Sequence, residues 1–358
     1  MMTYARKGFE SPALRAVLIA LVVGALLLLA SGYNPFDVYG ALAEGGLVGS
    51  GLRNTLKRSV PTVGMGLAVA VAIRSGLLNL GMEGQMLLGA LAGTAAALAL
   101  PPGPFAIVAA MVVGVLVGGA WALISALGQT RLGLPILVTS LLMNFVARGI
   151  ASYTVRFHLN DTGIESVATP QLDPATRLPS IPGSEAVSFL NGVDWSLIIV
   201  LLIVVALAVW ERRTVTGYET KMIGLNTFFG RYGGVPVERR TLQVMFLSGG
   251  IAGLVGVMLI LGEQGRYFDG ELLRANFAWI GLMVALLAAF RPVFVAIAGF
   301  GFAALQIGGL AIQRQVGVAS QFSLVIQALI IVFIAAPLLV RAIFPWGFKK
   351  SNTAGGGE

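Results

Sequence analysis

Long apolar runs recur along almost the whole chain, and they limit the folds it can adopt more than any other feature. Several of them approach the roughly 20 residues that an α-helix needs to cross a hydrocarbon core. Hydrophobic residues make up 57% of the sequence and charged residues only 11%. This pattern predicts an all-α polytopic membrane protein.

We expect about ten transmembrane helices. They form a single transmembrane domain over residues 13–343, between a short N-terminal segment (1–12) and a Gly-rich tail (344–358). The expected spans are residues 13–30, 60–73, 86–100, 105–127, 134–155, 195–210, 241–262, 277–290, 292–312 and 322–343. The first run is long for a signal peptide and lacks an Ala-x-Ala cleavage site, so it is interpreted as a retained span. Residues 32–59 are expected along the membrane interface, in part as a helix that begins near Ser50.

Two connections between the expected spans differ in charge. The proline-rich segment 156–194 is net acidic, whereas the loop 211–240, called here the basic loop, carries Arg212, Arg213, Lys221, Arg231, Arg239 and Arg240. Basic residues concentrate in cytoplasmic loops of membrane proteins. We therefore expect 156–194 outside the cell, the basic loop inside, and both termini in the cytoplasm. The net charge of +8 is explained in this way, and no nucleic-acid partner is expected.

A polar stretch interrupts the apolar sequence near residues 74–85. Ionisable and amide side chains at bilayer depth cost roughly 2.5–3.5 kcal/mol on insertion scales, and closely spaced glycines can break a helix there. The stretch therefore predicts a broken helix whose polar residues border a translocation path or its gate. The candidates are Asn79, Gly81, Glu83, Gly84, Gln85 and, from a later span, Asn144. The alternative is a short polar loop at the surface, with Glu83 solvated.

Asn144 and Arg148 lie four residues apart in the expected span 134–155, and therefore on one helical face. Arg148 is interpreted as extending its charge to the membrane interface, with a role in the pore as the alternative.

The basic loop contains a second group of unusual residues. Asn226 is a suitable N-cap for a short helix over Thr227 to Tyr232. That helix presents Phe228, Phe229 and Tyr232 on a surface otherwise exposed to water, which favours a protein partner. The alternative is an amphipathic helix on lipid headgroups.

Several kinds of chemistry are disfavoured. The sequence has no cysteine and a single histidine, His158, so no disulfide, zinc or haem site is expected. It has no Gly-x-x-x-x-Gly-Lys-Ser/Thr phosphate loop. No nucleophile and base are paired within the spans, so an intramembrane enzyme is also disfavoured.

Three motifs together resemble a known family. They are Asn79-x-Gly-x-Glu83-Gly-Gln85, the Gly224-Leu-Asn226 and Arg231-Tyr-Gly-Gly-Val235 motifs of the basic loop, and the small-residue stretch from Leu247 to Gly256. They look like those of permease subunits of bacterial ABC importers in the ribose and branched-chain amino-acid permease superfamily, over about 61–337. The first motif is similar to the nucleoside and simple-sugar branch. The segment 156–194 resembles the larger of the paired permeases in nucleoside importers.

The resemblance implies a chain without chemistry of its own, in the ten-helix importer architecture of a bacterial inner membrane. It implies a second, homologous permease subunit, two cytoplasmic ABC ATPase subunits, which use ATP and Mg, and an extracytoplasmic substrate-binding protein. No cofactor or metal is expected in this chain itself. The implied ATPase-coupling residues are Gly224, Leu225, Asn226, Phe228, Phe229, Arg231, Tyr232 and Gly233.

The function expected from these observations is ATP-driven import of nucleosides or a related small polar solute. A simple-sugar permease, ribose-like in its substrate, is the alternative, because Asn79, Gln85 and Asn144 offer hydrogen bonds that suit nucleosides, bases and sugars alike. An ion-coupled secondary transporter is a second alternative. It is disfavoured because Glu83 is nearly the only acid expected at depth.

Overall fold

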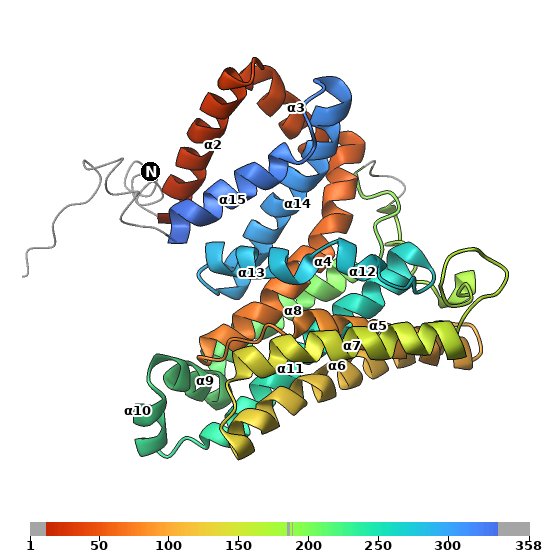
Figure 1. Cartoon of the computed structure of the whole chain (residues 1–358), viewed down its shortest axis with the longest axis vertical. Coiled ribbons are helices and arrows are strands. Elements are labelled where there is room, and N and C mark those ends of the chain that lie inside the picture. The colour runs from red at the N-terminus through yellow and green to blue at the C-terminus, as the bar shows by residue number, and fades with distance from the viewer. Residues whose placement is uncertain (1–11, 185–186, 188, 336–358) are drawn as a thin grey trace, which may run out of the picture. The chain divides into compact units, whose positions relative to one another are not determined.

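The computed structural model describes residues 12–184, 187 and 189–335, and the regular elements in these ranges are helices (Figure 1). This confirms the all-α prediction. The α-helices are α2 (Pro12–Ala30), α3 (Pro35–Leu47), α4 (Gly49–Arg74), α5 (Met82–Ala99), α6 (Pro104–Leu132), α7 (Ile136–His158), α8 (Ser196–Arg213), α9 (Val215–Leu225), α10 (Thr227–Tyr232), α11 (Val237–Leu259), α12 (Glu271–Arg274), α13 (Phe277–Leu287), α14 (Pro292–Gln315) and α15 (Phe322–Ala335). A π-helical turn, Ile260–Gln264, continues α11, and a 3₁₀ helix spans Pro174–Thr176.

The chain divides into two compact units, residues 1–45 with 308–358, and residues 46–307. In the described part of the smaller unit, α2 packs against α15. Its core contains Leu28, Val38 and Ile312, and the Tyr39 hydroxyl donates a 2.6 Å hydrogen bond to the carbonyl of Leu21.

The larger unit is organised around α11, which packs against α4, α5 and α6. Glycines make this close packing possible. A Cβ on Gly118 of α6 would lie 2.5 Å from the carbonyl oxygen of Gly249 and 2.9 Å from the Cα of Gly253. Without a Cβ the two backbones can approach closely, as is common between membrane helices. The small-residue stretch 247–256 is thus the contact face of α11.

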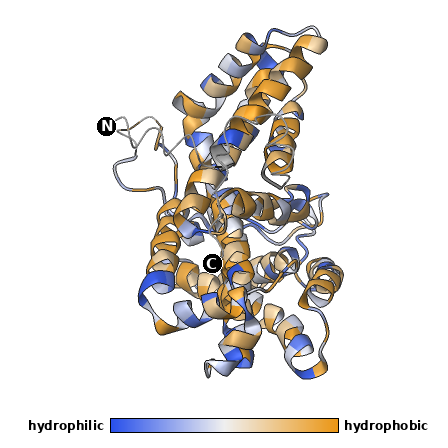
Figure 2. Ribbon diagram, turned by 90° about the vertical axis from the view of Figure 1, so that its left-hand side faces the viewer, coloured by the Kyte–Doolittle hydropathy of each residue, from blue (hydrophilic) through white to orange (hydrophobic). Residues whose placement is uncertain are grey.

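Five of the described helices are long and apolar enough to cross a membrane: α4, α6, α7, α14, and α11 with its π-helical turn. Two shorter apolar helices cover Arg15–Ala30 and Phe322–Phe333. Figure 2 shows the predominance of hydrophobic residues along the helices. The chain is therefore a multi-pass membrane protein. The expected count of ten spans stays a prediction.

The expectation for residues 32–73 was wrong in one respect. Residues 49–59 do not lie apart from the span 60–73, because both belong to the 26-residue helix α4, with Pro61 inside it. The Arg58 side chain in this part of α4 has partners from distant segments of the same chain. Arg58 donates from Nε to Oε1 of Gln306 at 2.9 Å and lies over the Phe277 ring at 4.5 Å.

The expected span 277–290 is also shorter than predicted. Helix α13 has 11 residues, or about 16 Å at 1.5 Å per residue, too short to cross the hydrocarbon core alone. It ends before Ala289 and Phe290, which both have positive φ.

The segment 156–194 folds against the chain that follows α11. Backbone hydrogen bonds join Thr169 N to Tyr267 O at 3.0 Å and Leu178 N to Leu261 O at 2.9 Å. An ion pair of 3.2 Å links Arg266 to Asp161.

Candidate functional site

The polar stretch near residues 74–85 does interrupt the helices, over a shorter range than predicted. Helix α4 ends at Arg74, and α5 begins at Met82. Gly76, with φ of +76°, takes the left-handed turn that lets the chain leave α4. Glu83, Gly84 and Gln85 were expected in the break, but they form the first turn of α5, because Gln85 N already donates to Gly81 O at 3.1 Å.

Asn79 and Gln85 close the break by binding each other. Asn79 Nδ2 donates to Gln85 Oε1 at 3.0 Å, and Gln85 Nε2 donates to Asn79 Oδ1 at 3.1 Å. Asn79 also donates to Oγ of Ser248 in α11 at 3.0 Å, and Ser248 donates to the carbonyl of Ala68 in α4 at 2.8 Å. Both amide residues are only 1% exposed. The alternative of a polar surface loop is therefore wrong, and the two amides hold α4, α5 and α11 together.

Helix α7 supplies the other partners of the break. Asn144 Oδ1 accepts from the N–H of Gly84 at 2.9 Å, and its Nδ2 donates to the carbonyl of Leu80 at 2.8 Å. Gly84 permits this approach, since a Cβ there would lie 2.8 Å from the Cβ of Ala147. A Cβ on Gly81 would similarly lie 2.9 Å from the carbonyl oxygen of Ser140.

Glu83 forms an ion pair with Arg148 of α7. Arg148 donates from both Nε, at 3.0 Å, and Nη2 to the same carboxylate oxygen, Oε1. Arg148 lies twelve residues after the first residue of α7 and ten before the last. Its charge is thus held near the middle of the helix by Glu83, and the interpretation that it extends to the membrane interface stays a prediction.

The ion pair lines a cavity of about 160 Å³ between α5, α7 and α13. The lining residues are Leu80, Met82, Glu83, Leu141, Asn144, Phe145, Arg148, Ala278, Trp279 and Leu282. Of the six path candidates, Glu83 and Asn144 line this cavity. Asn79 and Gln85 bind each other, with Asn79 also bound to Ser248 of α11, and Gly81 and Gly84 contact α7 through their backbones. Sequence reasoning missed Ser248 and Trp279, which come from segments far away in the chain.

In the basic loop, α9 and α10 form a short hairpin (Figure 1). Asn226 caps α10 as predicted, since its Oδ1 accepts from Phe229 N at 3.0 Å. The side chains of Leu225, Phe228, Phe229 and Tyr232 are exposed, with Tyr232 at 92%. The hairpin therefore presents an apolar surface that no other described residue covers.

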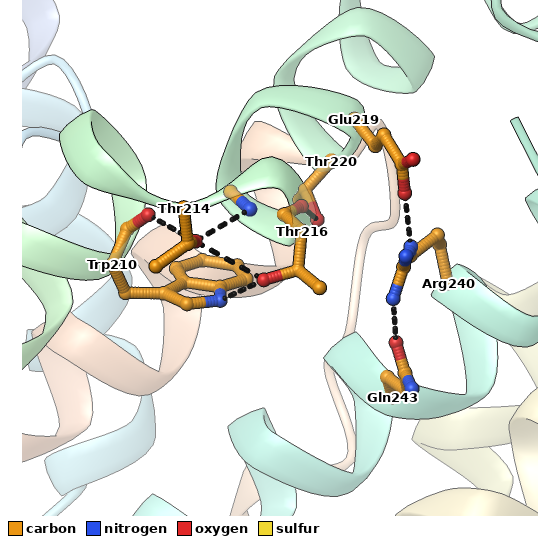
Figure 3. Close-up of polar contacts among 8 residues, drawn as sticks. Trp210, Thr214, Thr216, Glu219, Thr220, Arg240 and Gln243 are labelled. Atoms are coloured by element: carbon orange, nitrogen blue, oxygen red, sulfur yellow. Dashed lines mark hydrogen bonds and ion pairs between the residues drawn. The ribbon is translucent and has the colours of Figure 1, made fainter.

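Polar contacts fix α9 to its neighbours α8 and α11 (Figure 3). Trp210 Nε1 of α8 donates to Thr216 Oγ1 at 2.7 Å. Arg240 of α11 lies between two acceptors, and it donates to Glu219 Oε2 and to Gln243 Oε1, each at 2.5 Å. The base of the hairpin is thus held in place, while its aromatic tip stays exposed.

The hairpin also contacts the break. Gly224, near the end of α9, packs against the backbone of Arg74 and Gly76. Arg74 forms an ion pair with Glu211 of α8 and donates to the carbonyl of Phe290 at 3.3 Å.

Within the described part of the chain, no three His, Asp or Glu side chains gather into a group that could hold a metal ion.

Comparison with known proteins places these features in one family. Residues 51–335 match the family described as "Branched-chain amino acid transport system / permease component". The glucose ABC transporter permease protein TsgB13 of Haloferax volcanii is 34% identical over 337 residues, which cover 91% of this chain and 87% of that protein. The guanosine ABC transporter permease protein NupP of Bacillus subtilis is 29% identical over 334 residues, 92% of this chain and 93% of that protein. The nucleoside ABC transporter permease protein NupB of Lactococcus lactis is 27% identical over 339 residues, 92% of each chain. The chain therefore belongs to this family of ABC transporter permease components, which are membrane subunits without a catalytic role.

Proposed function

We propose that this chain forms the translocation pathway of an ATP-driven importer for nucleosides or a related small polar solute. One observation carries the proposal: in the first turn of α5, directly after the break, Glu83 forms an ion pair with Arg148 of α7, and this pair lines a cavity. Charges within membrane spans usually face a water-filled cavity or the interior of the bundle. Two of the similar proteins, NupP and NupB, are named for guanosine and nucleosides, which supports the substrate class.

The proposed ATPase partner is inferred from the exposed tip of the basic loop. Aromatic side chains in water favour a protein partner, and Leu225, Phe228, Phe229 and Tyr232 lie within the proposed ATPase-docking segment Gly224–Gly233. A second, homologous permease subunit completes the pathway, and a substrate-binding protein delivers the solute from outside. In this arrangement residues 13–343 form one permease domain of about ten spans in a bacterial inner membrane. The basic loop and both termini are cytoplasmic, and 156–194 lies outside.

A simple sugar is the second candidate substrate, and one observation favours it. The similar protein with 34% identity, TsgB13, is named as a glucose permease. Sugars and nucleosides share hydroxyl groups, so hydrogen bonding at the break does not separate them.

Uptake by the reconstituted importer tests the proposal. The chain is assembled in proteoliposomes with its partner permease, ATPase and binding protein, and uptake of labelled guanosine, uridine and glucose is measured with and without ATP. We expect ATP-dependent nucleoside uptake, and none by this chain alone. Glucose uptake without nucleoside uptake would establish the sugar alternative. Uptake driven by an ion gradient in the isolated chain would instead establish a secondary transporter.

A further inference from the structure

The cavity beside Glu83 and Arg148 cannot face lipid without a large energetic cost. Arg148 lies near the middle of α7 and Glu83 of α5 is paired with it, and charged side chains within a span cost several kcal/mol against hydrocarbon. Arg148 is nevertheless partly exposed in the isolated chain, at 42% of its side chain. In the assembled transporter this face therefore meets water, solute or another protein subunit.

The ion pair leaves two hydrogen-bonding atoms free at the cavity. Arg148 uses Nε and Nη2 on a single oxygen of Glu83, Oε1. Glu83 Oε2 and Arg148 Nη1 have no hydrogen-bond partner among the residues that the structure describes. A carboxylate oxygen accepts and a guanidinium N–H donates, so the ion pair leaves an acceptor on Glu83 and, on the guanidinium edge that faces away from the carboxylate, a donor on Arg148. Asn144 offers few further hydrogen bonds to a bound solute, because its amide already binds the backbone of Gly84 and Leu80.

The remaining walls are apolar and aromatic. Phe145 is 62% exposed and Trp279 is 47% exposed, and the Arg148 guanidinium carbon lies 5.6 Å from the centre of the Phe145 ring. A cavity of about 150 Å³ holds one benzene ring, so the 160 Å³ here suits a flat ring system. Binding sites commonly combine such apolar walls with a few convergent polar groups.

We propose that this cavity is a subsite for the heterocyclic base of a nucleoside. The base lies against Trp279 and Phe145, and its ring N–H donates to Glu83 Oε2. This inference rests on the proposed function and makes it more specific. A sugar fits less well, because its hydroxyls need several donors and acceptors around the ring, whereas most of the lining here is apolar or aromatic. Glu83, Trp279 and Phe145 are thereby assigned to substrate recognition, and Arg148 holds the Glu83 carboxylate in place.

Methylated nucleosides test the hydrogen bond from the ring N–H to Glu83 without altering the protein. In the complete importer, uptake of uridine is compared with that of 3-methyluridine, which has lost the ring N–H, and 5-methyluridine, which keeps it. Guanosine and 1-methylguanosine form the corresponding purine pair. We expect the 3-methyl and 1-methyl compounds to be carried at least tenfold more slowly, and 5-methyluridine at a rate near that of uridine. Because binding proteins also select substrates, the same compounds are tested for direct binding to the purified permease–ATPase complex without the binding protein.

Tryptophan fluorescence provides that binding measurement and locates the base. A stacked base should quench the emission of Trp279, so titration with uridine or guanosine should quench the wild-type complex and quench the Trp279→Phe complex markedly less. Trp195→Phe is the matched control, since Trp195 is a partly exposed tryptophan at the start of α8, outside the cavity. In transport, Trp279→Leu should lower kcat/KM for the nucleoside at least tenfold, and Trp195→Leu should not.

The outcomes separate the two proposals. If the wild-type importer carries no nucleoside, the proposed function fails, and the base subsite fails with it. If it carries nucleosides while the N-methylated compounds bind and move equally well and Trp279→Leu behaves like Trp195→Leu, only the base subsite is wrong.

Discussion

Gly224, near the end of α9, lies directly against the backbone of Arg74, the last residue of α4. A Cβ on Gly224 would lie 2.8 Å from the carbonyl carbon of Arg74 and 3.1 Å from the nitrogen of Gly76. Real Cβ atoms do not approach backbone this closely, so even one methyl group requires the chain to shift. The proposed ATPase-docking hairpin and the start of the break that precedes Glu83 are thus in contact through backbone, without an intervening flexible side chain.

The first prediction is that Gly224→Ala impairs transport. Overpacking of a tight contact typically costs 1–3 kcal/mol, and the strain falls here on the α4–α9 contact. We expect at least a tenfold loss of uptake, with the chain still present in the membrane at near-normal amounts. Reconstituted transport and the ATPase rate are measured together, and we expect ATP hydrolysis to continue with less solute carried per ATP.

Gly149→Ala is the matched control for this variant. Gly149 also lies in a helix, but a Cβ there would meet nothing within 4 Å, and alanine favours helix formation over glycine. Gly149→Ala should therefore transport as the wild type does. Equal transport by both variants would show that the contact at Gly224 carries no functional constraint.

The second prediction is that Asn79 contributes mainly to stability. Asn79→Ala removes the partners of Gln85, Ser248 and the N–H of Gly81. A buried polar group left without a partner costs about 1–3 kcal/mol. We expect the melting temperature of the purified complex to fall by several degrees. Asn54→Ala, at an exposed position of α4, should leave it unchanged. An unchanged melting temperature for Asn79→Ala would contradict the role of this amide as a structural lock.

The third prediction concerns the N-cap of α10. Asn226→Ala removes the acceptor for Phe229 N, and loss of such a cap typically costs about 1 kcal/mol of helix stability. Because α10 has only six residues, its aromatic side chains should lose their fixed arrangement. We expect less ATPase to copurify with the membrane subunits.

Asn226→Asp should keep most of the ATPase, because aspartate caps equally well. If Asn226→Ala retains the wild-type amount while remaining correctly inserted, α10 does not form the ATPase contact. The lipid-headgroup alternative for this helix would then be favoured.

Local patterns could be predicted from the sequence. The cap at Asn226 and the extent of α10 depend on residues within one turn, so the sequence alone identifies them. The break near Asn79 is equally local, because it follows from glycines and amides inside apolar sequence. Its limits do not follow from the local pattern, since Glu83 and Gln85 in the first turn of α5 depend on Arg148 of α7 and on Asn79 of the break as partners.

The remaining features depend on contacts between distant segments. Glu83 and Arg148 lie 65 residues apart, and Asn79 and Ser248 lie 169 apart, so no spacing rule pairs them. The same holds for α4. Taken by themselves, the charges of Lys57 and Arg58 and the proline at position 61 suggest that the apolar helix starts only after them. In the structure Gln306 and Phe277 contact Arg58, and α4 is one continuous helix.

The last prediction fixes the orientation in the membrane. The basic loop should be cytoplasmic and the segment 156–194 outside, because Lys and Arg concentrate in cytoplasmic loops. The chain contains no cysteine, so single cysteines report their location without background from this subunit. Thr227→Cys is exposed in the basic loop, and Ser166→Cys is exposed in the segment 156–194, unlike the buried Thr176. An impermeant thiol reagent on intact cells (spheroplasts, if an outer membrane is present) should label Ser166→Cys and spare Thr227→Cys, which should react only after the membrane is permeabilised. The reverse pattern would invert the topology and place the aromatic tip of α10 where no cytoplasmic ATPase could reach it.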